Sequence, residues 1–139
     1  MVMPLMRVLL ISANQLADPY PVYPLGVDHV AGAVAAGGHQ VQLLDLRERD
    51  VERAVTEAMG QFAPGVVGVS MRNVDNCDQT KSEGYVGLYH RVVRAVRRAT
   101  DAPLVLGGAA FSIFPGQFMA ALGADYGVLG EGERAVALL

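Results

Sequence analysis

The sequence predicts a doubly wound α/β domain, in which helices cover both faces of a five-stranded parallel sheet. Short apolar runs and amphipathic segments alternate along the whole chain, so that strand and helix follow one another repeatedly. The apolar runs are continuous and do not alternate with polar residues, which is typical of strands buried on both faces of a parallel sheet. A chain of 139 residues is long enough to enclose one such core.

Each element can be placed by its local pattern. Buried strands are predicted at residues 7–13, 40–46, 65–71, 103–108 and 125–130. Between them lie an apolar helix that ends at "GGH", two amphipathic helices and a short helix closed by glycine. These helices occupy residues 25–36, 51–62, 85–99 and 116–123, and a further helix begins at about Glu133. The arrangement is Rossmann-like or flavodoxin-like, and residues 1–139 form one domain that is predicted to be truncated after the start of this fifth helix.

Composition narrows the range of functions. The net charge is −3, and the arginines of "HRVVRAVRR" share a helix with an apolar face, which favours a solvated helix face over a nucleic-acid or phosphate site. The single cysteine, Cys77, excludes an internal disulfide and any site built on several thiolates of this chain. No apolar run is long enough for a membrane span and no signal peptide is evident, so we expect a cytoplasmic protein without a nucleic-acid or membrane partner.

The predicted site lies at the carboxyl ends of the strands, where open parallel sheets bind their ligands. Long or glycine-rich segments follow four of these strands, at residues 14–26, 72–84, 107–112 and 130–133. A G-x-G-x-x-G turn and a G-x-x-x-x-G-K-[ST] loop are both absent, which favours a broad, shallow site over a nucleotide slot. Asp45 stands where a ribose-binding acid would fall, but without the glycine turn a capping or turn role is favoured.

Simpler roles remain open for several residues of these loops. Gly107 and Gly108 could be ordinary turn glycines, and Asn73, Asp75 and Asn76 could form Asx-type turns.

Residues suited to catalysis are few. The histidines have no evident serine or cysteine partner, and the thiolate of Cys77 is disfavoured by Asp75 and Asp78. The pairs Asp75/Asp78 and Glu131/Glu133 are candidate ligands for a divalent cation. The domain is therefore predicted to hold a ligand rather than to react by itself.

Four stretches occur in a familiar order: "YPLGVDHVAGAVAAGGHQVQLLDL", "VVGVSMRNVDN", "VLGGAAFSIFP" and "GADYGVLGEGE". Together they resemble the N-terminal cobalamin-binding domain of cobalamin-dependent radical S-adenosylmethionine enzymes, and the resemblance covers nearly the whole chain. The "RNVDN" loop is similar to that of a subgroup that includes the tryptophan C-methyltransferase of thiopeptide biosynthesis.

The resemblance implies that the corrin ring of cobalamin lies across the carboxyl edge of the sheet, with its nucleotide tail between the strand loops. Glycines there would let the ring pass close to the backbone. The predicted cofactor-binding residues are Arg72, Asn73, Val74, Asp75, Asn76, Gly107, Gly108, Ser112, Gly130, Glu131 and Gly132. Glu133 is expected instead to stabilise the N-terminus of the last helix.

The cobalamin domain of the methionine-synthase type supplies a lower axial ligand to cobalt from an aspartate-x-histidine-x-x-glycine motif. Here Asp28 and His29 are adjacent and lie within a predicted helix, so we expect no metal ligand from this chain and cobalamin bound base-off. Arg72 is a candidate to lie beneath the cobalt and exclude water or histidine, since a guanidinium stays charged and is a poor metal ligand. A salt bridge from Arg72 to Asp75 or Asp78 is the alternative.

The sequence thus predicts the cobalamin-binding module of a methyltransferase that transfers a methyl group from S-adenosylmethionine to carbon. A downstream radical S-adenosylmethionine domain is the expected partner, and it would hold the [4Fe–4S] cluster and S-adenosylmethionine, because this chain lacks the C-x-x-x-C-x-x-C triplet. The module alone is not expected to be catalytic. One alternative is a flavodoxin-like interaction or signalling module that binds no corrinoid. Receiver domains of that kind keep an acidic pair at the end of the first strand and a lysine at the end of the fifth, where this chain has "SAN" and "GEGE". A stand-alone α/β enzyme is the other alternative.

Overall fold

The computed structural model describes residues 4–14, 23–47, 50–72 and 85–136, and it contains the predicted parallel sheet. Its strands are β1 (Arg7–Ser12), β2 (Gln40–Asp45), β3 (Val66–Ser70), β4 (Leu104–Gly107) and β5 (Tyr126–Gly127). They pair in the order β2-β1-β3-β4-β5, which is the flavodoxin-like order, with its switch point between β1 and β3. Every pair is parallel, so the carboxyl ends of the strands meet along one edge.

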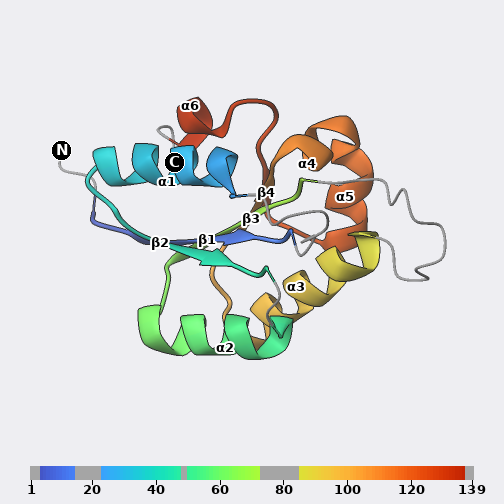
Figure 1. Ribbon diagram of the computed structural model, residues 1–139, viewed down its shortest axis with the longest axis horizontal. Coiled ribbons are helices and arrows are strands. Elements are labelled where there is room, and N and C mark those ends of the chain that lie inside the picture. Colours follow the sequence, from blue (N-terminus) through green and yellow to red (C-terminus); the bar gives the residue numbers. More distant parts are fainter. Residues whose placement is uncertain (1–3, 15–22, 48–49, 73–84, 137–139) are drawn as a thin grey trace.

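Helices cover both faces of the sheet, as predicted (Figure 1). On one face lie α1 (Leu25–Ala36) and α6 (Gly132–Val136), and on the other lie α2 (Val51–Phe62) and α3 (Tyr85–Ala99). The chain segment between β4 and β5 forms α4 (Ala109–Ile113) and α5 (Pro115–Leu122). The ring of Phe118 on α5 meets that of Tyr89 on α3 edge-on, with 5.8 Å between the centroids. No helix in the described parts of the chain has the length and apolar character needed to cross a membrane.

The two faces of the sheet are packed unequally. Alternate strand residues point toward α2 and α3 and join a large core whose strand members are Leu9, Ile11, Leu44, Val67, Val69, Leu104 and Leu106. Toward α1 the buried cluster is small and consists of Val8 and Leu10 from β1 with Val27, Ala31 and Val34 from α1. The face beneath α1 and α6 is therefore the one with room for a ligand.

Local signals explain where the helices begin and end. The Asp50 carboxylate accepts a hydrogen bond from the backbone N–H of Arg53 at 2.9 Å and caps the start of α2. Helix α5 begins at Pro115 and ends at Gly123, whose φ of 64° is the left-handed conformation that glycine adopts without strain.

Two elements differ from the sequence-based expectation. The loop predicted at residues 107–112 contains α4, because Phe111 turns into the large core and a helical turn brings it there. Strand β5 is limited to Tyr126–Gly127 instead of 125–130. The N–H of Val128 still donates to the carbonyl of Leu106 at 2.8 Å, but the chain then turns away at Gly130, where φ is 72°.

Asp125 of the "GADYG" segment ties three elements together. Its Oδ2 atom accepts hydrogen bonds from the backbone N–H of Leu104, at 2.8 Å, and from the guanidinium of Arg97, at 3.0 Å. The first of these bonds contributes most to a lowered pKa of the Asp125 carboxyl, and the second adds to it. The aspartate therefore fixes the start of β4 and β5 against the end of α3.

The lowered pKa makes the contribution of Asp125 to stability dependent on pH. That contribution is fully present above the pKa of an unfolded aspartate, about 3.9, and is lost as the pH falls through the lower folded value. We expect Asp125→Asn to lower the urea midpoint at pH 7, and the gap from the unsubstituted chain to narrow below about pH 4. Urea titrations at several pH values measure both quantities. The control Asp101→Asn, at an exposed acid, should leave the midpoint unchanged, and a gap of constant size at low pH would contradict the assignment.

Candidate functional site

The sheet face beneath α1 and α6 carries three rows of side chains that run across β1, β3 and β4. The strand register aligns them as Ser12–Ser70–Gly107 at the carboxyl ends, Leu10–Gly68–Val105 in the middle, and Val8–Val66 at the amino ends. The outermost row is small and partly polar, whereas the two inner rows are apolar. Gly68 and Gly107 carry no side chain and Ser12 and Ser70 carry short ones, which leaves this face hollow even though the Leu10 side chain reaches over Gly68.

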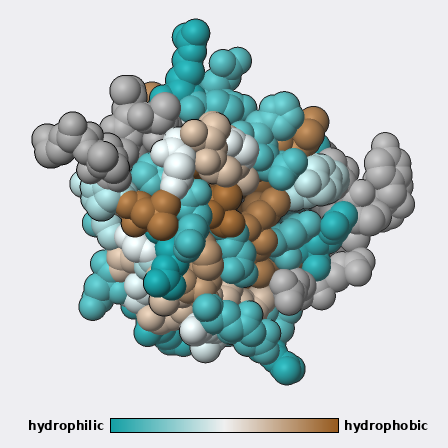
Figure 2. Space-filling view, turned by 90° about the vertical axis from the view of Figure 1, so that its left-hand side faces the viewer, coloured by the Kyte–Doolittle hydropathy of each residue, from teal (hydrophilic) through white to brown (hydrophobic). Residues whose placement is uncertain are grey.

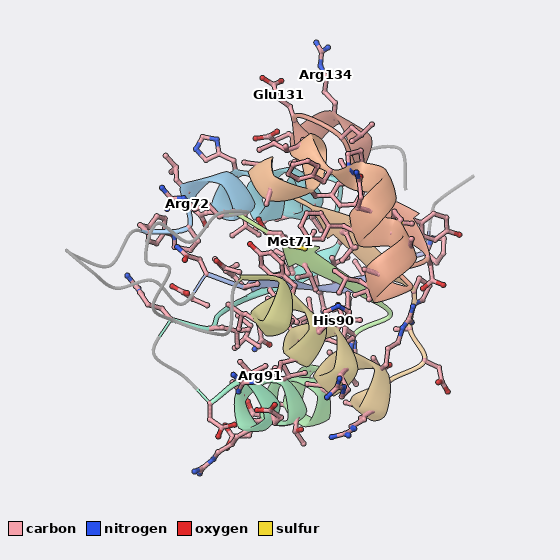
Figure 3. The ribbon with its side chains drawn as sticks, turned by 90° about the vertical axis from the view of Figure 1, so that its right-hand side faces the viewer. Met71, Arg72, His90, Arg91, Glu131 and Arg134 are labelled. Atoms are coloured by element: carbon pink, nitrogen blue, oxygen red, sulfur yellow. The ribbon has the colours of Figure 1, made fainter. Side chains whose placement is uncertain are left out.

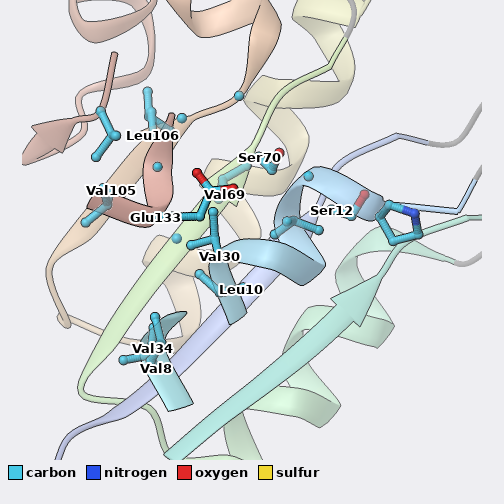
Figure 4. A pocket seen from close by; sticks show the side chains of 18 of the residues that line it. Val8, Leu10, Ser12, Val30, Val34, Val69, Ser70, Val105, Leu106 and Glu133 are labelled. Atoms are coloured by element: carbon cyan, nitrogen blue, oxygen red, sulfur yellow. The ribbon is translucent and has the colours of Figure 1, made fainter. Parts of the chain in front are cut away.

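A cavity of about 1070 Å³ lies over these rows. Its opposite wall is α1, from which Val30 and Val34 face Leu10 and Val8 of β1 (Figure 4). The volume is at the upper end of the roughly 300–1,000 Å³ usual for small-molecule sites. The cavity therefore has the size of a site for a large organic ligand, and it reaches the carboxyl edge where ligands are expected.

The cavity opens at the carboxyl edge of the sheet, and this opening is called the mouth. The segment after β5 forms one side of it. The backbone N–H of Gly130 donates to the Ser112 hydroxyl at 3.0 Å, so α4 holds this segment in place. A Cβ atom on Gly132 would lie 3.0 Å from Cγ2 of Val30, which shows how closely α6 approaches α1. Across the same contact, Nδ1 of His29 lies 4.0 Å from a carboxylate oxygen of Glu133.

The glycine pair after β4 packs directly on the chain after β3. The backbone N–H of Met71 donates to the carbonyl of Gly107 at 2.9 Å, and Ala110 donates to the carbonyl of Met71 at 2.9 Å. Gly108 has a φ of 99°, and a Cβ atom there would lie 2.5 Å from the Met71 carbonyl oxygen. Gly108 therefore has the turn role that the sequence left as an alternative. It also lines the cavity.

Arg72 follows β3 at the carboxyl edge of the sheet (Figure 3). Its side chain is exposed and borders the cavity mouth, near the start of α1. It makes no ion pair with another residue of the described ranges. The alternative partners Asp75 and Asp78 lie outside those ranges.

The structure brings the described members of the predicted cofactor-binding set to one cavity. Its lining includes Arg72, Gly107, Gly108, Ser112, Gly130, Glu131 and Gly132. Asn73, Val74, Asp75 and Asn76 lie outside the described residues, as does Cys77. Ser112 belongs to helix α4, not to a loop, and its hydroxyl supports the backbone at Gly130.

The remaining candidate residues take other positions. Glu131 points outward at the mouth (Figure 3), and the described residues contain no group of three or more potential metal ligands. Asp45 accepts a hydrogen bond from the backbone N–H of Arg47 at 3.1 Å and pairs with its guanidinium at 3.2 Å, which is the turn role expected of it.

None of the three histidines points into the mouth. The His29 side chain is 61% exposed and does not line the cavity. His39 lies at the amino edge of the sheet, where its Nδ1 accepts a hydrogen bond from the backbone N–H of Met6 at 3.2 Å. His90 is on α3, on the opposite face of the sheet (Figure 3).

The apolar interior of the cavity was not predicted from the sequence. The signal for it was Gly68, a lone glycine inside the apolar run "VVGVS", which is typical of a strand that another group approaches closely. Tyr23 was also missed. It lines the mouth, and a hydrogen bond to the Asp28 carboxylate is the main cause of its raised pKa.

The cavity runs the length of the sheet. Met6, His39, Pro103 and Tyr126 line its far end, next to the amino ends of the strands. On that face of the molecule, apolar residues gather near the middle and hydrophilic residues surround them (Figure 2).

Comparison with known proteins gives consistent results. The family model of the B12 binding domain matches residues 16–139. A tryptophan 2-C-methyltransferase from Streptomyces laurentii is 34% identical over 131 residues, which make up 93% of this chain and 22% of that protein.

Solved structures extend the comparison. TsrM from Kitasatospora setae, a radical S-adenosylmethionine methyltransferase, matches in two structures at 33% identity. The structure with cobalamin and a [4Fe–4S] cluster has a TM-score of 0.87 over 97% of this chain and 24% of that one. The structure with tryptophan and a S-adenosylmethionine analogue has a TM-score of 0.86 over 96% and 24%. A cobalamin-binding protein from Desulfitobacterium hafniense, 16% identical over 96% of this chain and 56% of that one, has a TM-score of 0.61 and shares the fold. The chain spans about a quarter of the length of the methyltransferases that it matches.

The fit of Gly108 against Met71 can be tested by adding one methyl group. Gly108→Ala should lower the free energy of unfolding by more than about 2 kcal/mol, because of the positive φ and the clash with the Met71 carbonyl. The control Gly116→Ala adds the same group to α5, where nothing lies within 4 Å, and should be neutral or slightly stabilising. Urea denaturation compares the two variants, and equal midpoints would contradict the packing described here.

Proposed function

The chain belongs to the B12-binding domain family, and we propose that it is the cobalamin-binding module of a radical S-adenosylmethionine methyltransferase. The observation that carries this proposal is the cavity between the sheet and α1, which opens at the glycine-lined carboxyl edge. The described residues that the sequence analysis singled out for cofactor binding all line this cavity, which supports a single site for one large cofactor.

The residues of the site fit the two parts of cobalamin. A broad, flat corrin ring needs an edge that it can approach closely, and Gly26 and Gly130 there have nothing within 4 Å of the position of a Cβ atom. The nucleotide tail ends in an aromatic base, which needs an enclosed apolar slot. The rows around Leu10, Gly68 and Val105 provide that slot beside the edge.

We propose that the corrinoid is held base-off and without a histidine ligand. His29 is the histidine nearest to the mouth, but it lies on the exposed side of α1 and faces Glu133. His39 and His90 are farther away, at the amino edge and on the other face of the sheet. The slot would hold the lower base away from the metal, and none of the three histidines is placed to take its position.

Arg72 is the residue proposed to lie under the ring. It is exposed at the mouth, directly after β3, and its guanidinium is a charged group that does not coordinate metals. In that position it would keep water from the lower face of the ring. Asn73, Val74, Asp75 and Asn76 remain proposed contacts from the same loop, together with the glycines and Ser112 at the edge.

The proposed role of the module is to bind, orient and shield. The bound corrinoid would supply a cobalt centre able to carry a methyl group, and the chain would leave the opposite face of the ring open. The donor, S-adenosylmethionine, and the [4Fe–4S] cluster belong in this proposal to a downstream radical S-adenosylmethionine domain. Methyl transfer to a carbon atom would require that domain, and this module alone is not catalytic.

Binding and ligation can be tested by titrating the chain with hydroxocobalamin, desalting it and recording the visible spectrum. We expect retained corrinoid with base-off features, unaltered in His29→Ala and altered in Arg72→Ala. A spectrum with a coordinated histidine that disappears in His29→Ala would contradict the proposed ligation while leaving the module in place. Failure to retain hydroxocobalamin or methylcobalamin would instead favour an interaction module.

The mouth of the cavity can be tested by blocking it. A Cβ atom on Gly107 has its nearest neighbour at 3.8 Å, so Gly107→Val should fold while its side chain occupies the mouth. We expect it to weaken cobalamin binding at least ~10-fold, because the added atoms take the volume of the ligand. Gly60→Val, on α2 across the sheet, is the matched control and should bind as the unsubstituted chain does. Equal affinities for the two variants, at similar urea midpoints, would show that cobalamin does not bind at this mouth.

A further inference from the structure

The polarity of the cavity changes with depth. Its polar side chains gather at the mouth: Ser12, Asn14, Tyr23, Asp45, Ser70, Arg72, Ser112, Glu131 and Glu133. Beyond the outermost row the walls are aliphatic, with Leu10, Val105 and Val8 on the sheet and Val30 and Val34 on α1. Val8, Leu10 and Val34 pack against one another in the small buried cluster, so the more accessible apolar walls are those of Val30 and Val66.

The backbone of the interior is not available to a ligand. The strands β1 and β3 are paired on both sides within the sheet, and Val30 and Val34 lie past the first turn of α1, where backbone groups bond within the helix. Among the described lining residues, polar side-chain atoms return only at the amino edge, with His39 and Tyr126. Nδ1 of His39 accepts a hydrogen bond from the backbone N–H of Met6, which leaves its Nε2–H as a donor, and the Tyr126 side chain is largely exposed, so both residues act only at this edge.

An occupant of this interior would find no hydrogen-bond partners along most of its length. Burying a polar group without a partner costs far more than the same group gains from apolar contact. A purine has ring nitrogens and an exocyclic group that need partners, whereas a dimethylbenzimidazole presents only carbon and methyl groups on its outer ring. The aliphatic rows are therefore suited to the second kind of base.

From this gradient we propose that the cavity selects corrinoids by their lower base, preferring an apolar benzimidazole to adenine. The inference rests on the proposed function, because it assigns the interior of the same site to the nucleotide tail. It adds a specificity that depends on Val8, Val30, Val34, Val66 and Val105, none of which would touch the metal. Selection occurs because the interior accepts aromatic surface but offers nothing to pair with polar edges.

The test compares three ligands by equilibrium dialysis with the 139-residue chain: cobalamin, the corrinoid that carries adenine as its lower base, and cobinamide, which lacks the nucleotide. We expect cobalamin to bind at least ~10-fold more tightly than the adenine corrinoid, since each unpaired polar atom is penalised, and cobinamide to bind weakly. Equal binding of cobalamin and the adenine corrinoid would overturn the selectivity and leave the proposed function intact. If none of the three binds, the proposed function itself fails, and the selectivity with it.

A pair of matched variants isolates the interior. Val66→Thr keeps the shape of the side chain and adds a hydroxyl at a half-buried position of the cavity wall on β3, so the preference for cobalamin over the adenine corrinoid should shrink several-fold. Val55→Thr makes the same change in α2, within the core on the other face, and should leave the ratio of the two affinities unchanged. Because the readout is a ratio, loss of stability in either variant affects both ligands alike. An unchanged ratio in Val66→Thr would contradict the proposal.

Discussion

The structure depends on the register of three parallel strands. Because β1, β3 and β4 are aligned without offset, Ser12, Ser70 and Gly107 form one row at the carboxyl ends, and Gly68 lies between Leu10 and Val105 in the next. A shift of a single residue would turn these positions to the other face and bring large apolar side chains in their place. The hollow under α1 therefore exists only in this register, and the cavity, its mouth and its apolar depth all follow from it.

The unequal packing of the two faces supports this arrangement. Helices α2 and α3 close one face with a large core, in which Leu9, Ile11, Val67 and Leu106 are almost completely buried. That core and the ties at Asp125 and Gly108 hold the strand ends in place. The other face then does not need to be filled by side chains from α1 and α6, and a ligand can supply the missing contacts.

Much of the fold could be predicted from the sequence, because each signal was local. The "GGH" stop of α1 and the amphipathic spacing of α2 and α3 gave their bounds correctly. A turn role for Gly108 was one of two that the sequence left open, and the glycine-rich segments lie at the carboxyl edge of the sheet as expected. Helix α4 was missed because it depends on Phe111 reaching a core built by distant elements. The depth of the cavity was missed for a similar reason, since it requires Gly68 and Ser70 to be aligned with residues more than fifty positions away along the chain.

The most direct test of the central claim is the valine methyl spectrum of the chain by nuclear magnetic resonance, recorded with and without cobalamin. An aromatic base between the sheet and α1 would shift the methyl signals of the cavity valines at positions 8, 30, 34, 66 and 105 by its ring current. The valines of the opposite core, at positions 55, 92 and 96, should stay in place. Shifts confined to the opposite core, or to residues at the mouth alone, would contradict the claim that the hollow of the sheet receives the cofactor.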